Sequence, residues 1–248
     1  MPKTKRKRRR RRRSPPHRFR RFAFLLGATL LVALAAQALT WPPVSELAQT
    51  DPHSTAFLER AAKRLAAEGR PRPELRWVPR SAIAVELQHA VVASEDMNFF
   101  SHSGFDWGEM RVAVEETLND GKRLRGASTL TQQLAKNLYL SPSRNPLRKV
   151  KEVLLTRQIE AQLSKHRILE IYLNVVEFGD GIYGVENAAR HYWGSSASSL
   201  SRQQAVELAA SLPSPRRWNP ASASKTYRSR VRSLEQRVAE SEWLRSQL

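Results

Sequence analysis

Apolar side chains recur every three or four residues along most of the chain beyond residue 55, which is the spacing of amphipathic helices. The pattern predicts helices at 56–67, 81–94 with Ser81 as the N-cap, 106–118, 129–138, 146–163, 165–173, 184–192 and 201–211, and a charge-rich last helix at 225–245. Strand signals are sparse and no repeat is apparent. We therefore expect a mainly α fold with one domain over 75–220, preceded by a linker with a short helix at 42–74 and followed by a C-terminal helix at 221–248.

Two helix starts carry specific signals. Thr129 and Gln132 have the spacing of a capping box, and Asn145 followed by Pro146 reads as an N-cap with proline in the first turn. On the first of these helices, Leu130, Leu134 and Leu138 form the predicted buried stripe, and Gln132, Gln133, Lys136 and Asn137 occupy the remaining circumference.

The N-terminus combines a basic tail with a long apolar run. Residues 1–21 contain 13 of the 42 Lys and Arg residues and no acid, so most of the formal net charge of +19 belongs to this tail. Residues 22–41 carry no charge at all. Twenty helical residues span about 30 Å, the thickness of a bilayer's hydrocarbon core. We expect a transmembrane helix at 22–41 with the basic tail in the cytoplasm and the rest of the chain outside.

A cleaved signal peptide is the alternative, because Ala33-Leu34-Ala35 offers small residues for cleavage. Under either interpretation the body of the protein is exported, and we therefore expect no nucleic-acid partner for it.

The chain has no cysteine, which excludes disulfide-stapled folds and thiolate metal sites.

Residues 95–106 concentrate reactive side chains. Glu95 and Asp96 stand beside three aromatic residues and His102, directly after an apolar helix. A carboxylate at the edge of apolar surface loses hydration, and this favours its use as a general base. A lone histidine is more often structural, and no second histidine at ligand spacing suggests zinc.

Positive charge gathers at the start of the predicted helix at 146–163. Its basic residues are Arg144, Arg148, Lys149 and Lys151, and Arg148 stands one turn before Glu152. The helix dipole adds to this charge, so a phosphate would bind well there. The alternative is a solvated basic face with an ordinary surface ion pair.

These segments resemble, in order and spacing, the motifs of the peptidoglycan glycosyltransferases, the family-51 fold. The resemblance is carried by Glu95-Asp96-x-x-Phe99-x-x-His102-x-Gly104-Phe105-Asp106, by Gly126-Ala-Ser-Thr-Leu-Thr-Gln-Gln-Leu-Ala-Lys136-Asn137, by Arg148-Lys-x-x-Glu152, by Gly181-Ile-Tyr-Gly184-x-x-x-Ala188-Ala189-x-x-Tyr192-Trp193-Gly194, and by Leu212-Pro213-x-Pro215-x-x-x-Asn219-Pro220. It covers residues 75–220 and implies a lysozyme-like domain. No room remains for a transpeptidase domain, so the sequence looks like the monofunctional branch. Gln204 departs from the family's usual Glu at that position.

The resemblance implies polymerisation of lipid II into glycan strands at the outer face of the inner membrane. Glu95 matches the base that deprotonates the acceptor's sugar hydroxyl, which attacks the donor with inversion and expels a polyprenyl pyrophosphate. Glu152 matches the family's second glutamate. The resemblance assigns phosphate and substrate binding to Lys136, Arg144, Arg148, Lys151, Gln132, Gln133, Asp96, His102 and Ser128, with Asp96 and His102 expected to shape the site rather than transfer protons.

Further expectations follow from the same resemblance. A divalent cation, Mg²⁺ or Mn²⁺, would bind with the substrate's pyrophosphate, while no protein metal site is predicted. The partners implied are lipid II, the growing glycan strand and the inner membrane, with other cell-wall synthases or divisome proteins as candidates. Met110, Val112, Val114 and Leu118 match either a bilayer-contacting jaw or ordinary core.

Two other functions stay open on the sequence. A peptidoglycan hydrolase or lytic transglycosylase shares the pattern of a helical domain with one catalytic glutamate, but its substrate has no pyrophosphate for the basic cluster to hold. A catalytically silent membrane scaffold is the third possibility.

Overall fold

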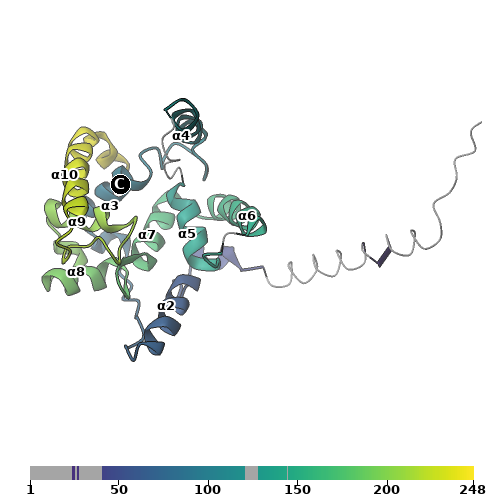
Figure 1. Cartoon of the computed structure of the whole chain (residues 1–248), viewed down its shortest axis with the longest axis horizontal. Helices are drawn as coiled ribbons and strands as arrows, with labels where there is room; N and C mark the ends of the chain where they lie inside the picture. The colour runs from purple at the N-terminus through teal and green to yellow at the C-terminus, as the bar shows by residue number, and fades with distance from the viewer. Residues whose placement is uncertain (1–23, 26, 28–40, 121–127, 144) are drawn as a thin grey trace, which may run out of the picture. The chain divides into compact units, whose positions relative to one another are not determined.

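The computed structural model describes residues 24, 25, 27, 41–120, 128–143 and 145–248. Residues 43–248 form one compact unit, and the account below concerns this unit (Figure 1). The basic tail at 1–21, nearly all of the predicted membrane segment at 22–41, and Arg144 lie outside the described residues. Among the described residues, no helix is both long and apolar enough to cross a membrane.

The unit is mainly helical, as predicted. Its elements are η1 (Val44–Ala48), α2 (Ala56–Ala67), η2 (Arg80–Ala82), α3 (Val85–Glu95), α4 (Trp107–Asp120), α5 (Leu130–Tyr139), α6 (Pro146–Gln162), α7 (Lys165–Val175), β1 (Glu177–Gly179), β2 (Ile182–Tyr183), α8 (Val185–Trp193), η3 (Ala197–Ser199), α9 (Arg202–Ser211), α10 (Lys225–Glu240) and η4 (Glu242–Gln247). Every helix that the hydrophobic pattern predicts is present, with ends shifted by a few residues.

Two predictions about these elements need correction. Ser81 does not cap α3, because it lies within the short turn η2 and Ala84 occupies the cap position without a side-chain bond. The chain after α9 is not one helix over 225–245, since α10 ends at Glu240 and a 3₁₀ turn follows. Both errors have the same cause. A polar residue followed by regularly spaced apolar residues is compatible with an α-helix and also with a short 3₁₀ turn next to one.

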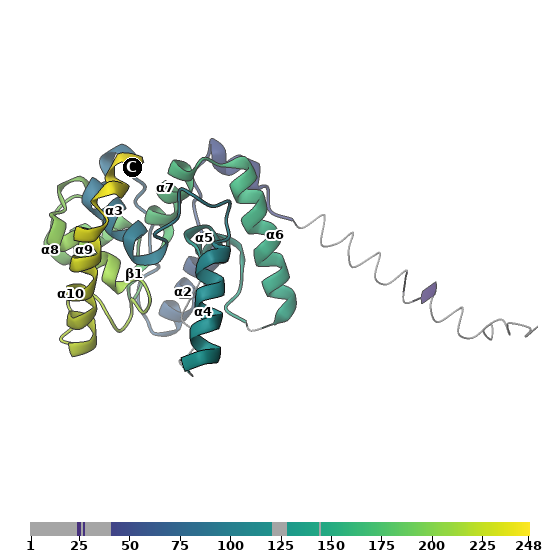
Figure 2. The ribbon, with the colours of Figure 1, turned by 90° about the horizontal axis from the view of Figure 1, so that it is seen from above.

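The helices pack in two groups around the centre of the unit. In one group, α5 contacts α2, α6 and α7, and in the other α3, α9 and α10 contact one another (Figures 1 and 2). The small antiparallel hairpin of β1 and β2 packs against α8. The C-terminal helix α10 is thus part of the same packed body as the helix that carries Glu95.

Helix α5 is buried around most of its circumference. Its leucine stripe is buried as predicted, but Gln132 and Asn137 on the opposite faces are buried as well. A helix enclosed on all sides must hydrogen-bond its polar side chains, and those of α5 do so within the protein.

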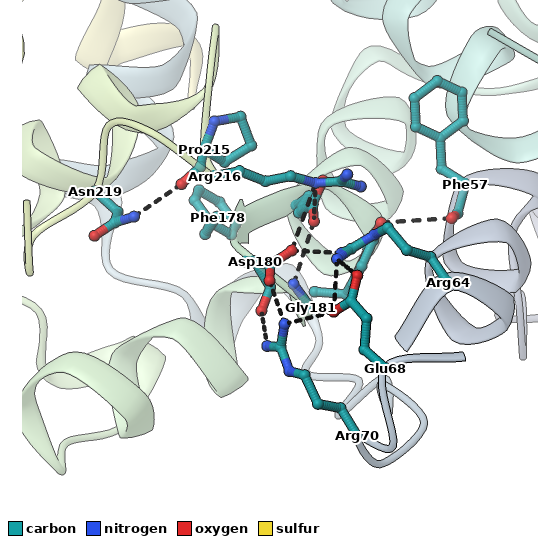
Figure 3. Close-up of polar contacts among 12 residues, drawn as sticks. Phe57, Arg64, Glu68, Arg70, Phe178, Asp180, Gly181, Pro215, Arg216 and Asn219 are labelled. Carbon is teal, nitrogen blue, oxygen red and sulfur yellow. Dashed lines mark hydrogen bonds and ion pairs between the residues drawn. The ribbon is translucent and has the colours of Figure 1, made fainter. Parts of the chain in front are cut away.

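An ion-pair cluster ties the hairpin to α2. Asp180, at the hairpin turn, pairs with Arg64 at the end of α2 and with Arg70 just beyond it (Figure 3). Arg216, from the loop that follows α9, reaches Glu177 at 3.1 Å. These partly exposed ion pairs join three segments that are far apart in the sequence. Their residues are not part of the Glu95 site described next.

Candidate active site

Glu95 is the last residue of α3 and lines a cavity, here called the Glu95 cavity. Its walls come from α3, α4 and α10 and from the loops before α4 and α5, and its lining residues are Ala93, Ser94, Glu95, Asp96, Met97, Asp106, Glu109, Ser128, Thr129 and Arg237. The Glu95 side chain is only 11% exposed. The acid that the sequence singles out is thus largely desolvated yet open to a cavity.

Both oxygens of the Glu95 carboxylate accept hydrogen bonds from neutral groups. The Ser94 hydroxyl donates to Oε1 at 3.1 Å, and the Gln133 side-chain amide donates to Oε2 at 2.9 Å. Gln133 is held in turn by the Tyr172 hydroxyl, which donates to its Oε1 at 3.0 Å. The carboxylate orientation therefore depends on α5 and α7 as well as on its own helix.

Asp96 and His102 link the motif segment to the start of α5. Asp96 accepts a bond from His102 Nε2 at 2.9 Å and another from the backbone N–H of Leu130 at 2.9 Å. The backbone N–H of Gly104 donates to His102 Nδ1 at 3.1 Å, which assigns the proton of a neutral ring to Nε2. Asp96 thus satisfies one of the unpaired N–H groups at the helix start.

Gly104 allows this segment to approach α6 closely. Its φ of +90° lies in the region that favours glycine, and an added Cβ would stand 2.8 Å from Thr156 Cγ2. Its carbonyl accepts a bond from the Thr129 hydroxyl at 2.7 Å. The capping box of Thr129 and Gln132 is present as predicted, and α5 therefore begins at a point tied to the motif segment.

Lys136 on α5 connects the two glutamates electrostatically. Burial lowers the pKa of its ammonium group, and attraction to Glu152 and, more weakly, to Glu95 opposes that change. Arg148 and Lys149 add to the lowering by repulsion. A desolvated cation within range of both acids is the arrangement expected where an anionic group binds between them.

Glu152 organises cations on α6. Its side chain is 5% exposed, Arg148 Nη1 donates to Oε2 at 2.7 Å, and Lys149 Nζ donates to Oε1. Asn145 caps this helix through the N–H of Leu147 at 2.9 Å, as predicted. The predicted pairing of Arg148 with Glu152 is confirmed. The pair is not an ordinary surface ion pair, because the Glu152 carboxylate is buried.

A second cavity, here called the α6 cavity, lies between the start of α4 and α6. Its lining residues are Ser103, Phe105, Trp107, Met110, Gln132, Lys149, Val153, Arg157, Glu160 and Ala161. Phe105 stacks on Trp107 with ring centroids 5.6 Å apart. This cavity is more apolar than the Glu95 cavity and has cationic side chains on its α6 wall.

Only some of the residues expected from the sequence line these two cavities, and the lining of neither includes Lys136, Arg148, Lys151 or Glu152. Ser128 and Asp96 line the Glu95 cavity, and Gln133 bonds its acid. Gln132 lines the α6 cavity, and its side-chain oxygen accepts the backbone N–H of Thr129 in the capping box. Lys151 is half-buried on α6.

Sequence reasoning missed three residues at the site. Tyr172 supports Gln133, and both Arg230 and Arg237 reach the Glu95 region from α10. The charge-rich pattern of α10 suggests a solvated helix, and no local signal separates these two arginines from the others on it. Only the packing of α10 on α3 reveals them.

The described residues do not fit a metal site built by the protein alone. No group of three His, Cys, Asp or Glu side chains stands close enough to hold an ion within the ranges that the structure covers. Both oxygens of Glu152 are already occupied by cationic side chains. A divalent ion here would depend on oxygens from a ligand.

Helix α4 exposes apolar side chains. Trp107 and Leu118 are 70% and 78% exposed, and Val112 and Val114 are exposed as well. The alternative that this helix contributes ordinary core is therefore wrong for the two valines and Leu118. Leu147, Val150 and Leu154 form another exposed apolar row on α6, and such patches mark contact with a partner or a membrane.

A helical domain with a desolvated glutamate in a cavity beside clustered cations is the arrangement of an enzyme that acts on an anionic substrate. Residues 62–239 match the Transglycosylase family, and the chain belongs to this family.

Relatives with similar sequences carry names that fit this family. A biosynthetic peptidoglycan transglycosylase of Rhodospirillum centenum is 45% identical over 90% of this chain and 92% of its own length. Proteins of the same name from Laribacter hongkongensis and Aromatoleum aromaticum are 46% and 50% identical, over 76% and 68% of this chain and 83% and 74% of theirs.

Proposed function

We propose that this protein polymerises lipid II into glycan strands, with Glu95 as the general base. The carboxylate takes the proton of the acceptor sugar's 4-hydroxyl as that oxygen bonds to the donor's anomeric carbon. The bond from that carbon to the pyrophosphate breaks on the opposite face, and polyprenyl pyrophosphate leaves with inversion. The coarser assignment, peptidoglycan glycosyl transfer, rests on the family and on its named relatives.

The position of Lys136 carries this proposal. A general base and a leaving-group site must lie on either side of one reacting carbon, and Lys136 is a half-buried cation that both Glu95 and Glu152 influence. Its ammonium charge costs free energy to bury, and a diphosphate bound between the two acids would offset that cost. The geometry thus suits an anionic leaving group better than a neutral one.

The remaining roles follow from the same arrangement. Arg148, Lys151 and Arg144 are proposed to hold the pyrophosphate with Lys136, and Glu152 keeps Arg148 and Lys149 in place by accepting from both. Gln133 orients the base. Mg²⁺ or Mn²⁺ would enter on the substrate's pyrophosphate, and no step is assigned to it.

We place the enzyme at the outer face of the inner membrane, anchored through residues 22–41 with the basic tail in the cytoplasm. A substrate carried on a polyprenyl chain lies in the bilayer plane, where a tethered enzyme meets it efficiently. The exposed apolar side chains of α4 and α6 would contact the same membrane. A lysozyme-like arrangement of the helices is part of this proposal, as are growing strands and other cell-wall synthases or divisome proteins as partners.

Incubation with lipid II and, separately, with isolated sacculi tests the proposal. We expect glycan strands and released polyprenyl pyrophosphate from lipid II, and no product from sacculi. Soluble muropeptides from sacculi without strands from lipid II would instead identify a hydrolase or lytic transglycosylase. Absence of activity in both assays would favour a scaffold.

The matched variants are Glu95→Gln and Glu235→Gln. The first removes the proposed base with little change in shape, and we expect polymerisation to fall by about 10² to 10⁴. The second changes an exposed glutamate on α10 and should polymerise like the unaltered protein. Full activity of Glu95→Gln would refute the assignment of the base.

A further inference from the structure

Arg230 of the C-terminal helix reaches the proposed base. Its Nη2 lies 3.7 Å from Glu95 Oε1 and 3.5 Å from the Ser94 hydroxyl oxygen, which itself donates to Oε1. The separation from Glu95 is too long for a hydrogen bond but short enough for strong attraction between charges.

Packing keeps this guanidinium in place. Helix α10 contacts both α3 and α9. Arg230 Nε donates to the Ala210 carbonyl near the end of α9 at 3.2 Å, and the side chain is 35% exposed. Burial lowers the pKa of Arg230, while the charge of Glu95 acts in the opposite direction. The side chain is therefore anchored on α9 and directed at Glu95, which is a different arrangement from a solvated surface arginine.

We propose that Arg230 is a positioning residue, which holds the Glu95 carboxylate in its ionised form and in its orientation toward the cavity. The proposal rests on the proposed function of Glu95 as the base. It extends the site to a segment that sequence motifs place outside it, since Arg230 lies beyond residue 220. Without this cation, the oxygen that Ser94 binds would lose a guanidinium that lies 3.7 Å away.

Other titratable groups also lie near Glu95 and set the background against which Arg230 acts. They are Asp96 on its own segment, Lys136 on α5, Asp106 and Glu109 at the start of α4, Tyr172 on α7 and Arg237 on α10. Three of these are carboxylic acids, whose negative charges repel the charge of Glu95. Arg230, Lys136 and Arg237 are the cations that offset them, and Arg230 forms an ion pair with Glu95 at 3.7 Å.

The test measures lipid II polymerisation against pH for the full chain carrying Arg230→Gln, Arg230→Lys or Arg232→Gln. Removing the cation favours the protonated, inactive base, so we expect the acid limb of kcat for Arg230→Gln to move up by about one pH unit. At its optimum, kcat should fall about 10-fold to 100-fold with little change in KM. Arg230→Lys keeps the charge and should restore the acid limb.

Arg232→Gln is the matched control, because Arg232 is exposed on the same helix two residues away. It should match the unaltered protein in rate, acid limb and melting temperature. An Arg230→Gln protein that loses activity equally at every pH, with a lowered melting temperature, would overturn the proposal in favour of a structural role.

A double variant separates this proposal from the one it rests on. If Arg230 acts through Glu95, Arg230→Gln should cause no further loss in a Glu95→Gln background. An equal loss in both backgrounds would overturn the role of Arg230 and leave that of Glu95 intact. Full activity of Glu95→Gln alone would instead refute the proposed base.

Discussion

The surroundings of the two glutamates differ in the kind of group that binds each carboxylate. Glu95 accepts from a hydroxyl and an amide, with its nearest guanidinium at 3.7 Å. Glu152, at similar burial, has both oxygens bonded directly to cationic side chains. The first carboxylate keeps acceptor capacity for another hydrogen, whereas the charge of the second is already neutralised.

This difference separates two tasks that one acidic residue could not perform together. A base must gain a proton, and neutral donors leave it free to do so. An organiser of cations must stay ionised, and its buried position strengthens the attraction that keeps Arg148 and Lys149 near the helix start. Four substitutions test this division.

Replacing Glu95 by Asp should give the largest effect. The shorter side chain withdraws the carboxylate from Gln133 and from the cavity, so we expect polymerisation to fall by about 10² or more. Because the charge is kept, the melting temperature should change little. Near-normal rates with lipid II would show that the carboxylate position is not critical.

Glu152→Gln should give an intermediate loss of activity together with a loss of stability. Two cations would lose their partner, and we expect about 10-fold lower polymerisation and about 1 kcal/mol less unfolding free energy, a figure reduced because Lys149 is 52% exposed. Urea unfolding followed by circular dichroism measures the stability. A change in activity without any change in stability would mean that Glu152 acts on substrate directly.

Lys136→Arg should move the alkaline limit of activity. Burial lowers the pKa of Lys136, so the folded protein holds fewer protons than the unfolded chain between that pKa and 10.5. Stability attributable to this group therefore rises with pH through that window, while the cation needed for pyrophosphate is lost. Arginine stays charged, so the alkaline limb should shift upward in a pH profile, provided that the larger side chain is accommodated. An unchanged limb would exclude Lys136 as its source.

Tyr172→Phe should give the smallest effect. It removes the hydroxyl that holds Gln133, whose side-chain oxygen would lose a bond, at a cost of about 1 kcal/mol. Activity should fall only a few-fold, since Gln133 still reaches Glu95. A loss as large as that of the Glu95 variants would assign Tyr172 a more direct part.

Much of the fold could be predicted because local signals agree with the tertiary structure. The capping box at Thr129 and the Asn145 cap mark the starts of α5 and α6, and both form as the sequence indicates. Gln204, a departure from the family pattern, makes a second capping box with Ser201, so the change keeps the helix start intact. Ser81 shows the limit, since a capping residue is also a good turn residue.

The site could be predicted only where its residues share a motif. Glu95, Asp96 and His102 lie within eight positions, and the contact of His102 with Asp96 follows from that proximity. Arg230 lies 135 positions after Glu95, on a helix whose pattern resembles any exposed charged helix. Contacts of this kind depend on how helices pack, and a single sequence does not record them.

The enclosure of α5 on nearly every side restricts how this enzyme can vary. Its leucines support the interior while its intervening polar residues serve the chemistry, so neither set can change without disturbing the other. A saturation library should find α5 the least tolerant helix of the domain. Thermostable versions are better sought among the outward positions of α10, where Arg228 and Glu235 face solvent.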